Sequence, residues 1–291
     1  MKVFLTGGSG DLGLLLSREL EMRGDLPVRM DIRAPKNPQR GEVIEGSILD
    51  RDLLAQSLTG ADCIVHIAAW HGVHDFTGQK NVYDFWDLNV TGTFNVFQAA
   101  VDMGISHVVF ISSTSVEDRT GVYGHTKILN EEMVHAYRER HGLPIITLRP
   151  GAFIPPWNTS VYKTYLEWVQ WFWKGAVHIS DVMQGVLQAV DLLIRDEPLP
   201  DIPLTLDGQY DYKPADMQNW DAEGVGSTFM KYYARYAEMV QGFGLDISQK
   251  PHTFDISQTH RWLGYDPQYG MSDLLQEMEK YGADGPPPPE F

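Results

Sequence analysis

The sequence predicts an α/β fold, in which a doubly wound parallel sheet carries a small, interleaved C-terminal region. Short apolar, β-prone runs alternate with apolar residues at helical spacing over about the first 150 residues. The first of these runs stops at a cluster of glycines, and the alternation loosens after Pro150. Strands that alternate with helices in this way are typical of a parallel sheet covered on both faces.

The individual elements follow in chain order. We expect strands at 2–6, 28–32, 42–45, 63–68, 108–112 and 145–148. Helices are expected at 12–20, 51–58, 89–103, 123–141, 181–194 and 228–241. A Trp-rich segment follows Pro155 and Pro156, and the proline-rich end of the chain is expected to be disordered or extended.

Composition excludes several classes of protein. The 291 residues include 23 Lys and Arg against 39 Asp and Glu, a formal net charge of −16, which argues against nucleic-acid and anionic-membrane partners. No apolar run approaches the roughly 20 residues that span a bilayer. The lone Cys63 forms neither an internal disulfide nor a CxxC metal site. Because the start of the chain lacks the apolar core of a signal peptide, we expect a cytoplasmic protein.

A glycine-rich loop, TGGSGDLG at 6–13, joins the first strand to the first helix. Gly7, Gly10 and Gly13 let the backbone turn tightly and approach a pyrophosphate, whose charge the helix N-terminus stabilises. This context predicts a Rossmann-type nucleotide site, the alternative being a flexible βα turn. We expect a nucleotide-binding domain at 1–155 and 176–208, a substrate-binding region at 156–175 and 209–281, and a tail at 282–291.

The second strand ends at Asp31, where a carboxylate accepts hydrogen bonds from the adenosine ribose hydroxyls and repels a 2′-phosphate. This residue predicts NAD rather than NADP as the cofactor. Arg33, two residues on, leaves NADP open, because a guanidinium can hold that phosphate. A solvated Asp in a turn is the structural alternative.

Tyr123 and Lys127 lie four residues apart on an expected helix, and therefore on one face. A nearby ammonium, together with the positive nicotinamide ring, is expected to lower the Tyr123 pKa, so that the phenol exchanges a proton with a substrate hydroxyl. His66 lies in an expected buried strand and is interpreted as a core residue.

With these motifs, the sequence resembles the extended short-chain dehydrogenases/reductases of the NAD-dependent epimerase/dehydratase type, from Lys2 to about Tyr281. The matching segments are TGGSGDLG at 6–13, DCIVHIAA at 62–69, NVTGTFN at 89–95, ISS at 111–113, YGHTK at 123–127, LRP at 148–150, VHISDV at 177–182, FDIS at 254–257 and LGYDP at 263–267.

The resemblance implies a role for each matching residue. Tyr123 would be the acid/base, Lys127 would bind the nicotinamide ribose, Ser113 would hydrogen-bond the reacting oxygen, and Asn89 would position Lys127 through a water. Residues expected at NAD are Gly7, Ser9, Gly10, Asp11, Leu12, Gly13, Asp31, Arg33, Ser47, Ile48, Ile67, Ala68, Ala69, Tyr123, Lys127 and Pro150.

The chain departs from the family pattern at two places. Ser47 stands where relatives usually place an Asp against the adenine, and the connection from Ser113 to Tyr123 is short and reads Val116-Glu-Asp118. Thr114 and Ser115 are therefore alternatives to Ser113 as the hydrogen-bond donor.

Substrate residues are expected at Trp70, His71, His74, Ser113, Thr114 and Ala152. Ala152 stands where nucleotide-sugar enzymes of the family place an Asn, and few arginines follow Arg149. We therefore expect a smaller, sugar-like substrate. The two loop histidines lack a third neighbouring ligand, so no metal site is expected.

The leading prediction is an NAD-dependent oxidoreductase acting on a secondary alcohol or ketone. An epimerase or dehydratase that retains NAD uses the same residues and stays open, and a non-catalytic NAD-binding protein is the third reading. The family resemblance also implies a homodimer through the helices at 89–103 and 123–141.

Overall fold

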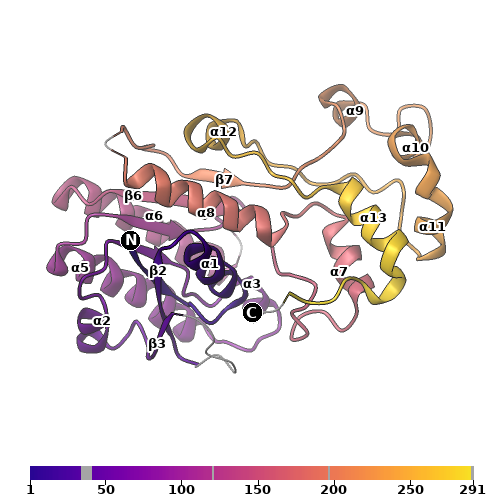
Figure 1. Ribbon diagram of the computed structural model, residues 1–291. Helices are drawn as coiled ribbons and strands as arrows, with labels where there is room; N and C mark the ends of the chain where they lie inside the picture. Colours follow the sequence, from indigo (N-terminus) through magenta and orange to yellow (C-terminus); the bar gives the residue numbers. More distant parts are fainter. Residues whose placement is uncertain (34–40, 120, 196, 290–291) are drawn as a thin grey trace.

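A parallel sheet of seven strands forms the centre of the protein. The computed structural model describes residues 1–33, 41–119, 121–195 and 197–289 (Figure 1). The strands are β1 (Lys2–Thr6), β2 (Leu26–Asp31), β3 (Glu42–Glu45), β4 (Cys63–His66), β5 (Val108–Ile111), β6 (Ile145–Pro150) and β7 (Leu204–Leu206). Their order is β3-β2-β1-β4-β5-β6-β7, and every neighbouring pair is parallel. The predicted doubly wound, Rossmann-like sheet is confirmed.

Helices cover both faces of the sheet. On one face, α1 (Asp11–Met22) and α8 (Ile179–Leu193) pack on a buried cluster that includes Val3 and Leu5. On the other face, α2 (Arg51–Ser57), α5 (Thr93–Met103) and α6 (Val122–His141) pack on a cluster that includes Phe4. Alternation along β1 therefore supplies both cores, as expected for a strand buried on both faces.

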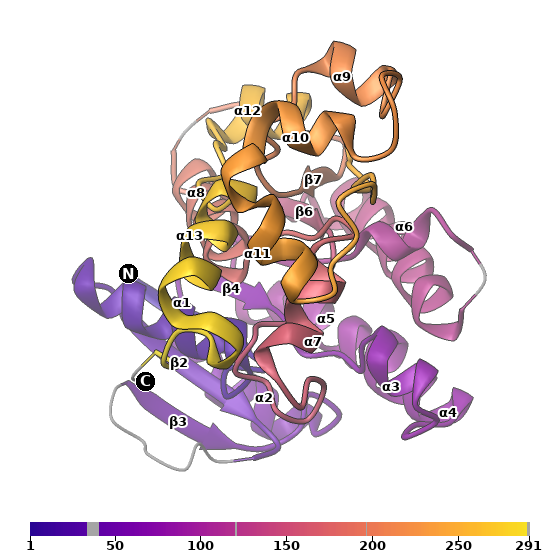
Figure 2. The ribbon, with the colours of Figure 1, turned by 90° about the vertical axis from the view of Figure 1, so that its right-hand side faces the viewer.

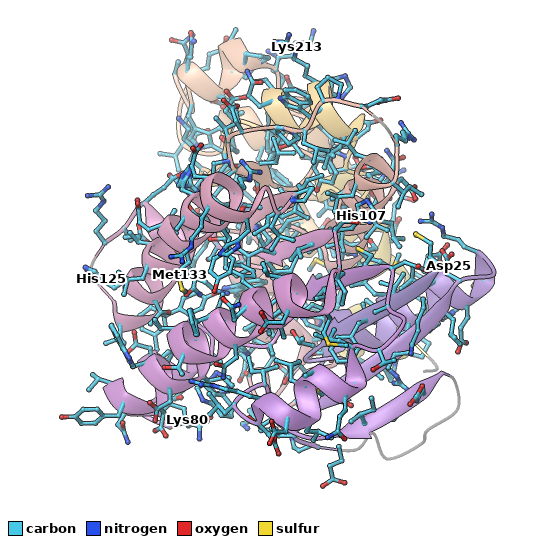
Figure 3. All side chains as sticks on the ribbon, turned by 90° about the vertical axis from the view of Figure 1, so that its left-hand side faces the viewer. Asp25, Lys80, His107, His125, Met133 and Lys213 are labelled. Atoms are coloured by element: carbon cyan, nitrogen blue, oxygen red, sulfur yellow. The ribbon has the colours of Figure 1, made fainter. Side chains whose placement is uncertain are left out.

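A second, aromatic-rich region lies beyond one end of the sheet (Figure 2). Its helices are α7 (Tyr165–Phe172), α9 (Pro214–Gln218), α10 (Ser227–Tyr233), α11 (Ala237–Gly242) and α13 (Met271–Tyr281). Trp168 and Phe229 are fully buried in its core. The helix α12 (Ser257–Leu263) instead packs against β7 and α8. Figure 3 views the molecule from the side opposite to that of Figure 2, with Lys213 at the top and Lys80 near the bottom.

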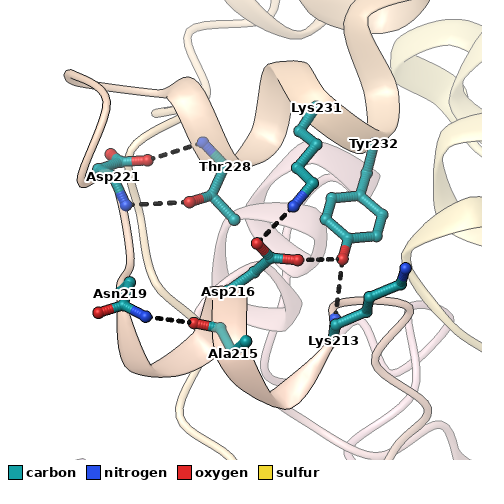
Figure 4. Close-up of polar contacts among 8 residues, drawn as sticks. All are labelled: Lys213, Ala215, Asp216, Asn219, Asp221, Thr228, Lys231 and Tyr232. Carbon is teal, nitrogen blue, oxygen red and sulfur yellow. Dashed lines mark hydrogen bonds and ion pairs between the residues drawn. The ribbon is translucent and has the colours of Figure 1, made fainter.

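Polar contacts hold the tip of this region together (Figure 4). The Asp216 carboxylate accepts hydrogen bonds from the Lys231 ammonium, at 2.6 Å, and from the Tyr232 hydroxyl. The Asp221 carboxylate accepts a hydrogen bond from the backbone N–H of Thr228, at 3.1 Å, and the Thr228 hydroxyl accepts one from Asp221 N–H. These contacts hold α9, and the loop between α9 and α10, against α10.

Several elements differ from the prediction. The expected helix at 89–103 begins earlier, as the π-helix Trp86–Gly92, and the expected helix at 228–241 is broken by a 3-10 turn, Ala234–Tyr236. The short helices α3 (Gly72–Phe76) and α4 (Val82–Phe85) were not expected. In the tail, Gly282–Asp284 forms a 3-10 turn, and Gly285 lies directly against the Tyr165 ring.

Within the described ranges, no helix is both long and apolar enough to cross a bilayer. The predicted division of the chain into two regions stays a prediction.

Candidate active site

The glycine loop lies at the carboxyl edge of the sheet, between β1 and α1. Gly7 adopts a positive φ of 69°, and a Cβ there would lie 2.9 Å from the backbone nitrogen of Ala68. A Cβ on Gly13 would lie 2.6 Å from Cα of Gly8. Since only glycine fits such close backbone approaches, these positions hold β1, α1 and the end of β4 in contact.

The loop has the features of a pyrophosphate cradle. No side chain of the described part of the molecule caps the start of α1 at Gly10, so the first N–H groups of α1 are open to an anion. The hydroxyl of Ser9 is buried and has no hydrogen-bond partner among the residues that the structure describes. A phosphate oxygen would satisfy both kinds of donor, so these residues fit a dinucleotide.

Asp11 connects this loop to the segment that follows β6. Its carboxylate accepts hydrogen bonds from the Trp157 indole N–H, at 3.2 Å, and from the Asn158 amide, at 2.8 Å. Burial raises the pKa of Asp11, against the effect of these two hydrogen bonds. The sequence places Asp11 at the cofactor but does not show these long-range partners.

Asp31 ends β2 beside the glycine loop. One carboxylate oxygen accepts a hydrogen bond from Ser9 N–H and the other from Arg33 N–H, both at 3.1 Å. The Arg33 side chain itself is exposed. On the next strand connection, the Ile48 carbonyl accepts a hydrogen bond from Asn95 at 3.0 Å, and the hydroxyl of Ser47 accepts one from Leu49 N–H. The 46–48 segment lies beside Asp31, since Gly46 N–H donates a hydrogen bond to the Asp31 carbonyl at 2.9 Å, and the role of these residues at adenosine stays a prediction.

His66 is a core residue, as expected from the sequence. It is buried, and its ring nitrogens hydrogen-bond the Thr6 and Thr93 hydroxyls at 2.7 and 2.9 Å. Burial lowers the His66 pKa to about 3, so the ring is neutral. The same Thr6 hydroxyl accepts hydrogen bonds from the backbone N–H groups of Ile67 and Ala68. This network fixes the segment where β4 ends, and Ala69 follows it.

Tyr123, Lys127 and Ser113 come together at the ends of α6 and β5. The Lys127 ammonium is buried, donates a hydrogen bond to the Ile111 carbonyl at 2.7 Å, and lies 5.8 Å from the centre of the Tyr123 ring. The Ser113 side chain lies beside the Tyr123 phenol, and its hydroxyl donates a hydrogen bond to the Ser115 hydroxyl at 3.0 Å. A Cβ on Gly124 would lie 2.5 Å from the Ser115 carbonyl oxygen. Glycine at this position therefore lets the 113–115 segment after β5, called the serine loop below, pack directly on α6.

The expected lowering of the Tyr123 pKa is not found in the chain by itself. Burial raises the pKa of Tyr123 to about 12, although the neighbouring Ser113 side chain acts in the opposite direction. Burial also lowers the pKa of Lys127 to about 7, against the charge of Glu131. Desolvation therefore dominates both groups, and the protein alone keeps the phenol protonated near neutral pH.

Asn89 is hydrogen-bonded to Trp70 and Thr126, and its water-mediated link to Lys127 stays a prediction. Its side-chain oxygen accepts a hydrogen bond from Trp70 N–H, and its amide donates to the Trp70 carbonyl, both at 2.8 Å. The amide also donates to the Thr126 hydroxyl at 3.0 Å. Asn89 lies in the π-helix Trp86–Gly92, a type of distortion that is frequent at functional sites. Its position fixes the loop after β4 on α6.

His71 is the last residue of that loop and His74 lies in α3, next to the catalytic candidates. Their rings are in edge contact at 4.3 Å between centres, and burial lowers the pKa of His71 to about 4. The His74 pKa is also lowered by burial. The Trp70 ring is covered by the Lys80 ammonium at 4.1 Å from the ring centre. The loop and α3 thus place two neutral imidazoles and an aromatic ring near Tyr123. The backbone N–H of Tyr123 donates a hydrogen bond to the Asp75 carboxylate of α3 at 3.4 Å.

The end of β6 completes the edge. The Thr114 hydroxyl lies 3.5 Å from the carbonyl of Pro150, which it can reach as a weak donor. Ala152 is exposed, and its carbonyl accepts a hydrogen bond from Val177 N–H at 3.0 Å. These two hydrogen bonds connect Thr114 to Pro150 and Ala152 to Val177, and neither of them involves Tyr123.

Sequence reasoning missed Glu131, which is buried one turn beyond Lys127 on α6. Its carboxylate accepts hydrogen bonds from the Arg149 guanidinium and the Ser112 hydroxyl. The signal that could have found it is the helical spacing Tyr123, Lys127, Glu131, which places three polar groups on one face.

Comparison with known proteins decides the family. Residues 3–179 match the model of the NAD dependent epimerase/dehydratase family. The chain belongs to this family. Membership makes the protein an NAD-dependent enzyme, and the cradle around Gly10, Ser9 and Asp31 fits that cofactor.

Characterised relatives in the family act on different substrates. The chain is 24% identical to 3 beta-hydroxysteroid dehydrogenase/Delta 5-->4-isomerase of Mycobacterium tuberculosis, over 96% of this chain and 90% of the relative. It is 25% identical to uronate dehydrogenase of Pseudomonas putida, over 57% of this chain and 67% of the relative. The solved UDP-glucuronic acid 4-epimerase of Bacillus cereus, crystallised with UDP-glucuronic acid and NAD, superposes with a TM-score of 0.71 at 20% identity, over 97% of this chain and 98% of that one. That structural likeness shows the shared fold.

Proposed function

We propose that the protein is an NAD-dependent dehydrogenase that oxidises a secondary hydroxyl of a small, sugar-like substrate, or reduces the corresponding ketone. The observation that carries the proposal is the placement of the buried Lys127 ammonium one turn along α6 from Tyr123, 5.8 Å from the centre of its ring, with the Ser113 side chain beside the phenol. This group lies at the same edge of the sheet as the glycine loop. A partly buried phenol beside a buried ammonium is suited to proton transfer at a substrate oxygen.

In the proposed mechanism, each residue acts at a stated atom. Bound NAD supplies the hydride acceptor. In the oxidation direction Tyr123 acts as the phenolate, after the phenol has released its own proton, and its oxygen takes the proton of the substrate hydroxyl as the substrate carbon is oxidised. In the reverse direction the Tyr123 phenol gives its proton to the substrate oxygen. Ser113 donates a hydrogen bond to the same substrate oxygen, while the Lys127 ammonium stabilises the phenolate.

The distribution of cations supports a substrate without a diphosphate. Every arginine after Pro150 is an exposed side chain: Arg195, Arg235 and Arg261. The lysines after Pro150 are exposed as well: Lys163, Lys174, Lys213, Lys231, Lys250 and Lys280. A diphosphate is commonly bound by clustered, partly buried guanidinium and ammonium groups. The neutral His71 and His74 rings and the Trp70 ring instead suit hydroxyl groups and sugar C–H faces.

The test is a turnover screen with purified protein. NAD+ would be supplied with a panel of free sugars, sugar acids, hydroxysteroids, simple secondary alcohols and nucleotide sugars, and NADH formation followed by absorbance. We expect NADH with at least one sugar or sugar acid. Tight NAD binding together with nucleotide-sugar interconversion and no net NADH would contradict the dehydrogenase and support an epimerase that retains its cofactor.

We also propose a homodimer in which α5 and α6 of two copies pack together. Exposed apolar side chains on these helices support it: Phe94 and Met103 on α5, and Leu129 on α6. Figure 3 looks onto this side of the molecule, where α6 carries the labelled His125 and Met133. Light scattering at micromolar concentration should give a dimer mass for the unaltered protein and a monomer mass for Phe94→Asp/Leu129→Asp. Met230→Asp, an equally exposed apolar site on α10, is the control that should stay dimeric. A monomeric unaltered protein would refute the proposal.

A further inference from the structure

Glu131 is held rigidly by groups from two strands. One of its carboxylate oxygens accepts hydrogen bonds from the Ser112 hydroxyl at 2.5 Å and from Arg149 Nε at 2.9 Å. The other accepts from Arg149 Nη2 at 2.5 Å. A bidentate guanidinium pair of this kind fixes the orientation of the carboxylate.

The three residues link the elements that carry the candidate active site. Ser112 immediately precedes Ser113 at the end of β5, Arg149 immediately precedes Pro150 at the end of β6, and Glu131 follows Lys127 by one turn of α6. A displacement of the carboxylate would therefore move both the serine loop and the helix face that bears Lys127.

Among the described residues, Glu131 is the carboxylate whose negative charge acts on the positive charge of the Lys127 ammonium. The ionisable groups that face it are Tyr123 and Glu131 on α6, His66 on β4 and His71 in the following loop. Both histidines are neutral near pH 7, because burial lowers their pKa values to about 3 and about 4. Burial lowers the pKa of Lys127 to about 7, and Glu131 is the carboxylate whose charge opposes that effect among the described residues.

We propose that Glu131 is a positioning residue of the active site, whose carboxylate, anchored by Arg149 and Ser112, keeps the buried Lys127 ammonium charged and in place for the cofactor ribose. The inference rests on the assignment of Lys127 to that ribose, which is part of the proposed function. Glu131 touches neither substrate nor cofactor and acts through Lys127.

The test measures NADH binding in the absence of any substrate, so that an error in the substrate class cannot affect it. The NADH dissociation constant would be followed by fluorescence titration from about pH 5.5 to about pH 9, so that the range extends to both sides of the Lys127 pKa of about 7. Since the charged ammonium is the form that binds the ribose, NADH affinity should be full at low pH and fall as the pH rises through the Lys127 pKa.

Two variants separate charge from hydrogen bonding. Glu131→Gln keeps the shape of the side chain and removes its charge, so the pH midpoint should fall by about one unit, and NADH should bind about tenfold more weakly above both midpoints. Ser112→Ala removes a hydrogen bond but keeps the charge, so its midpoint should stay within about 0.2 units. Glu132→Gln, at the exposed neighbouring position on α6, should match the unaltered protein.

A folded Glu131→Gln protein with an unchanged midpoint would overturn the inference, and so would Ser112→Ala shifting the midpoint as far as Glu131→Gln. If Glu131→Gln does not fold, Glu131→Asp keeps the charge one methylene further from Lys127 and should shift the midpoint in the same direction by less. In Lys127→Met, the pH dependence should disappear. Its persistence there would overturn the assignment of Lys127 itself, and the inference with it.

Discussion

Replacing Tyr123 by Phe is expected to lower kcat by about a thousandfold, because general acid–base catalysis by a positioned side chain commonly contributes a factor of about 10²–10⁴. The variant keeps the aromatic ring and removes only the hydroxyl that lies beside Ser113. NADH binding should therefore stay within about a factor of three of the unaltered protein. The measurement is kcat at saturating substrate, using a compound found in the turnover screen, with NADH titration and thermal unfolding of the same samples.

The matched control lies on the same helix. Tyr137 of α6 donates its hydroxyl hydrogen bond to Gln98, at 3.0 Å, away from the candidate site. Tyr137→Phe removes one hydroxyl just as Tyr123→Phe does, and it should leave kcat unchanged. A folded Tyr123→Phe enzyme that retains more than about a tenth of kcat would show that another group transfers the proton.

Replacing Asp31 by Ala is expected to weaken NAD binding by about 10- to 100-fold, since hydrogen bonds to a charged group contribute about 1.5–3 kcal/mol. Affinity for NADP should rise at the same time, because the carboxylate that repels a 2′-phosphate is gone and the Arg33 side chain nearby is exposed. Calorimetric titration with each nucleotide measures both effects.

A second substitution at this position separates charge from the loop geometry. Asp31 also accepts the Ser9 N–H hydrogen bond, so Asp31→Ala loosens the glycine loop as well as removing charge. Asp31→Asn keeps an acceptor for Ser9 and should lose less NAD affinity, while still gaining NADP affinity. If both variants bind NAD as the unaltered protein does and still reject NADP, the ribose is recognised elsewhere.

The regular part of the fold follows directly from the sequence. The strands β1, β4, β5 and β6 contain short apolar runs bounded by turn residues or a helix, and even the half-charged β3, Glu42–Glu45, was found from its place between turn residues. The strand β7, Leu204–Leu206, was not predicted, since three residues after a proline give no measurable period. The π-helix was missed for a related reason, because a hydrophobic pattern does not reveal an extra residue in a turn.

For the site, local motifs succeed and long-range partners do not. The glycine loop, Asp31 and the Tyr123–Lys127 pair are defined by nearby residues, and the structure brings them to one edge of the sheet. The partners of Asp11 lie 146 and 147 residues away, and only packing determines them. The pKa of Tyr123 could not be predicted either, because burial is a property of the whole fold and outweighs the local charge.

The central sheet is built from residues that precede α7 and residues that follow it in the sequence. β7 pairs with β6, α8 covers β5 and β6, and Trp157 and Asn158 hold Asp11 at the start of α1. During synthesis, a nascent chain that has emerged only as far as Pro150 therefore has the complete glycine loop but an uncovered apolar face. The sheet therefore gains its last strand only after Leu206 has left the ribosome, well after the glycine loop has been made.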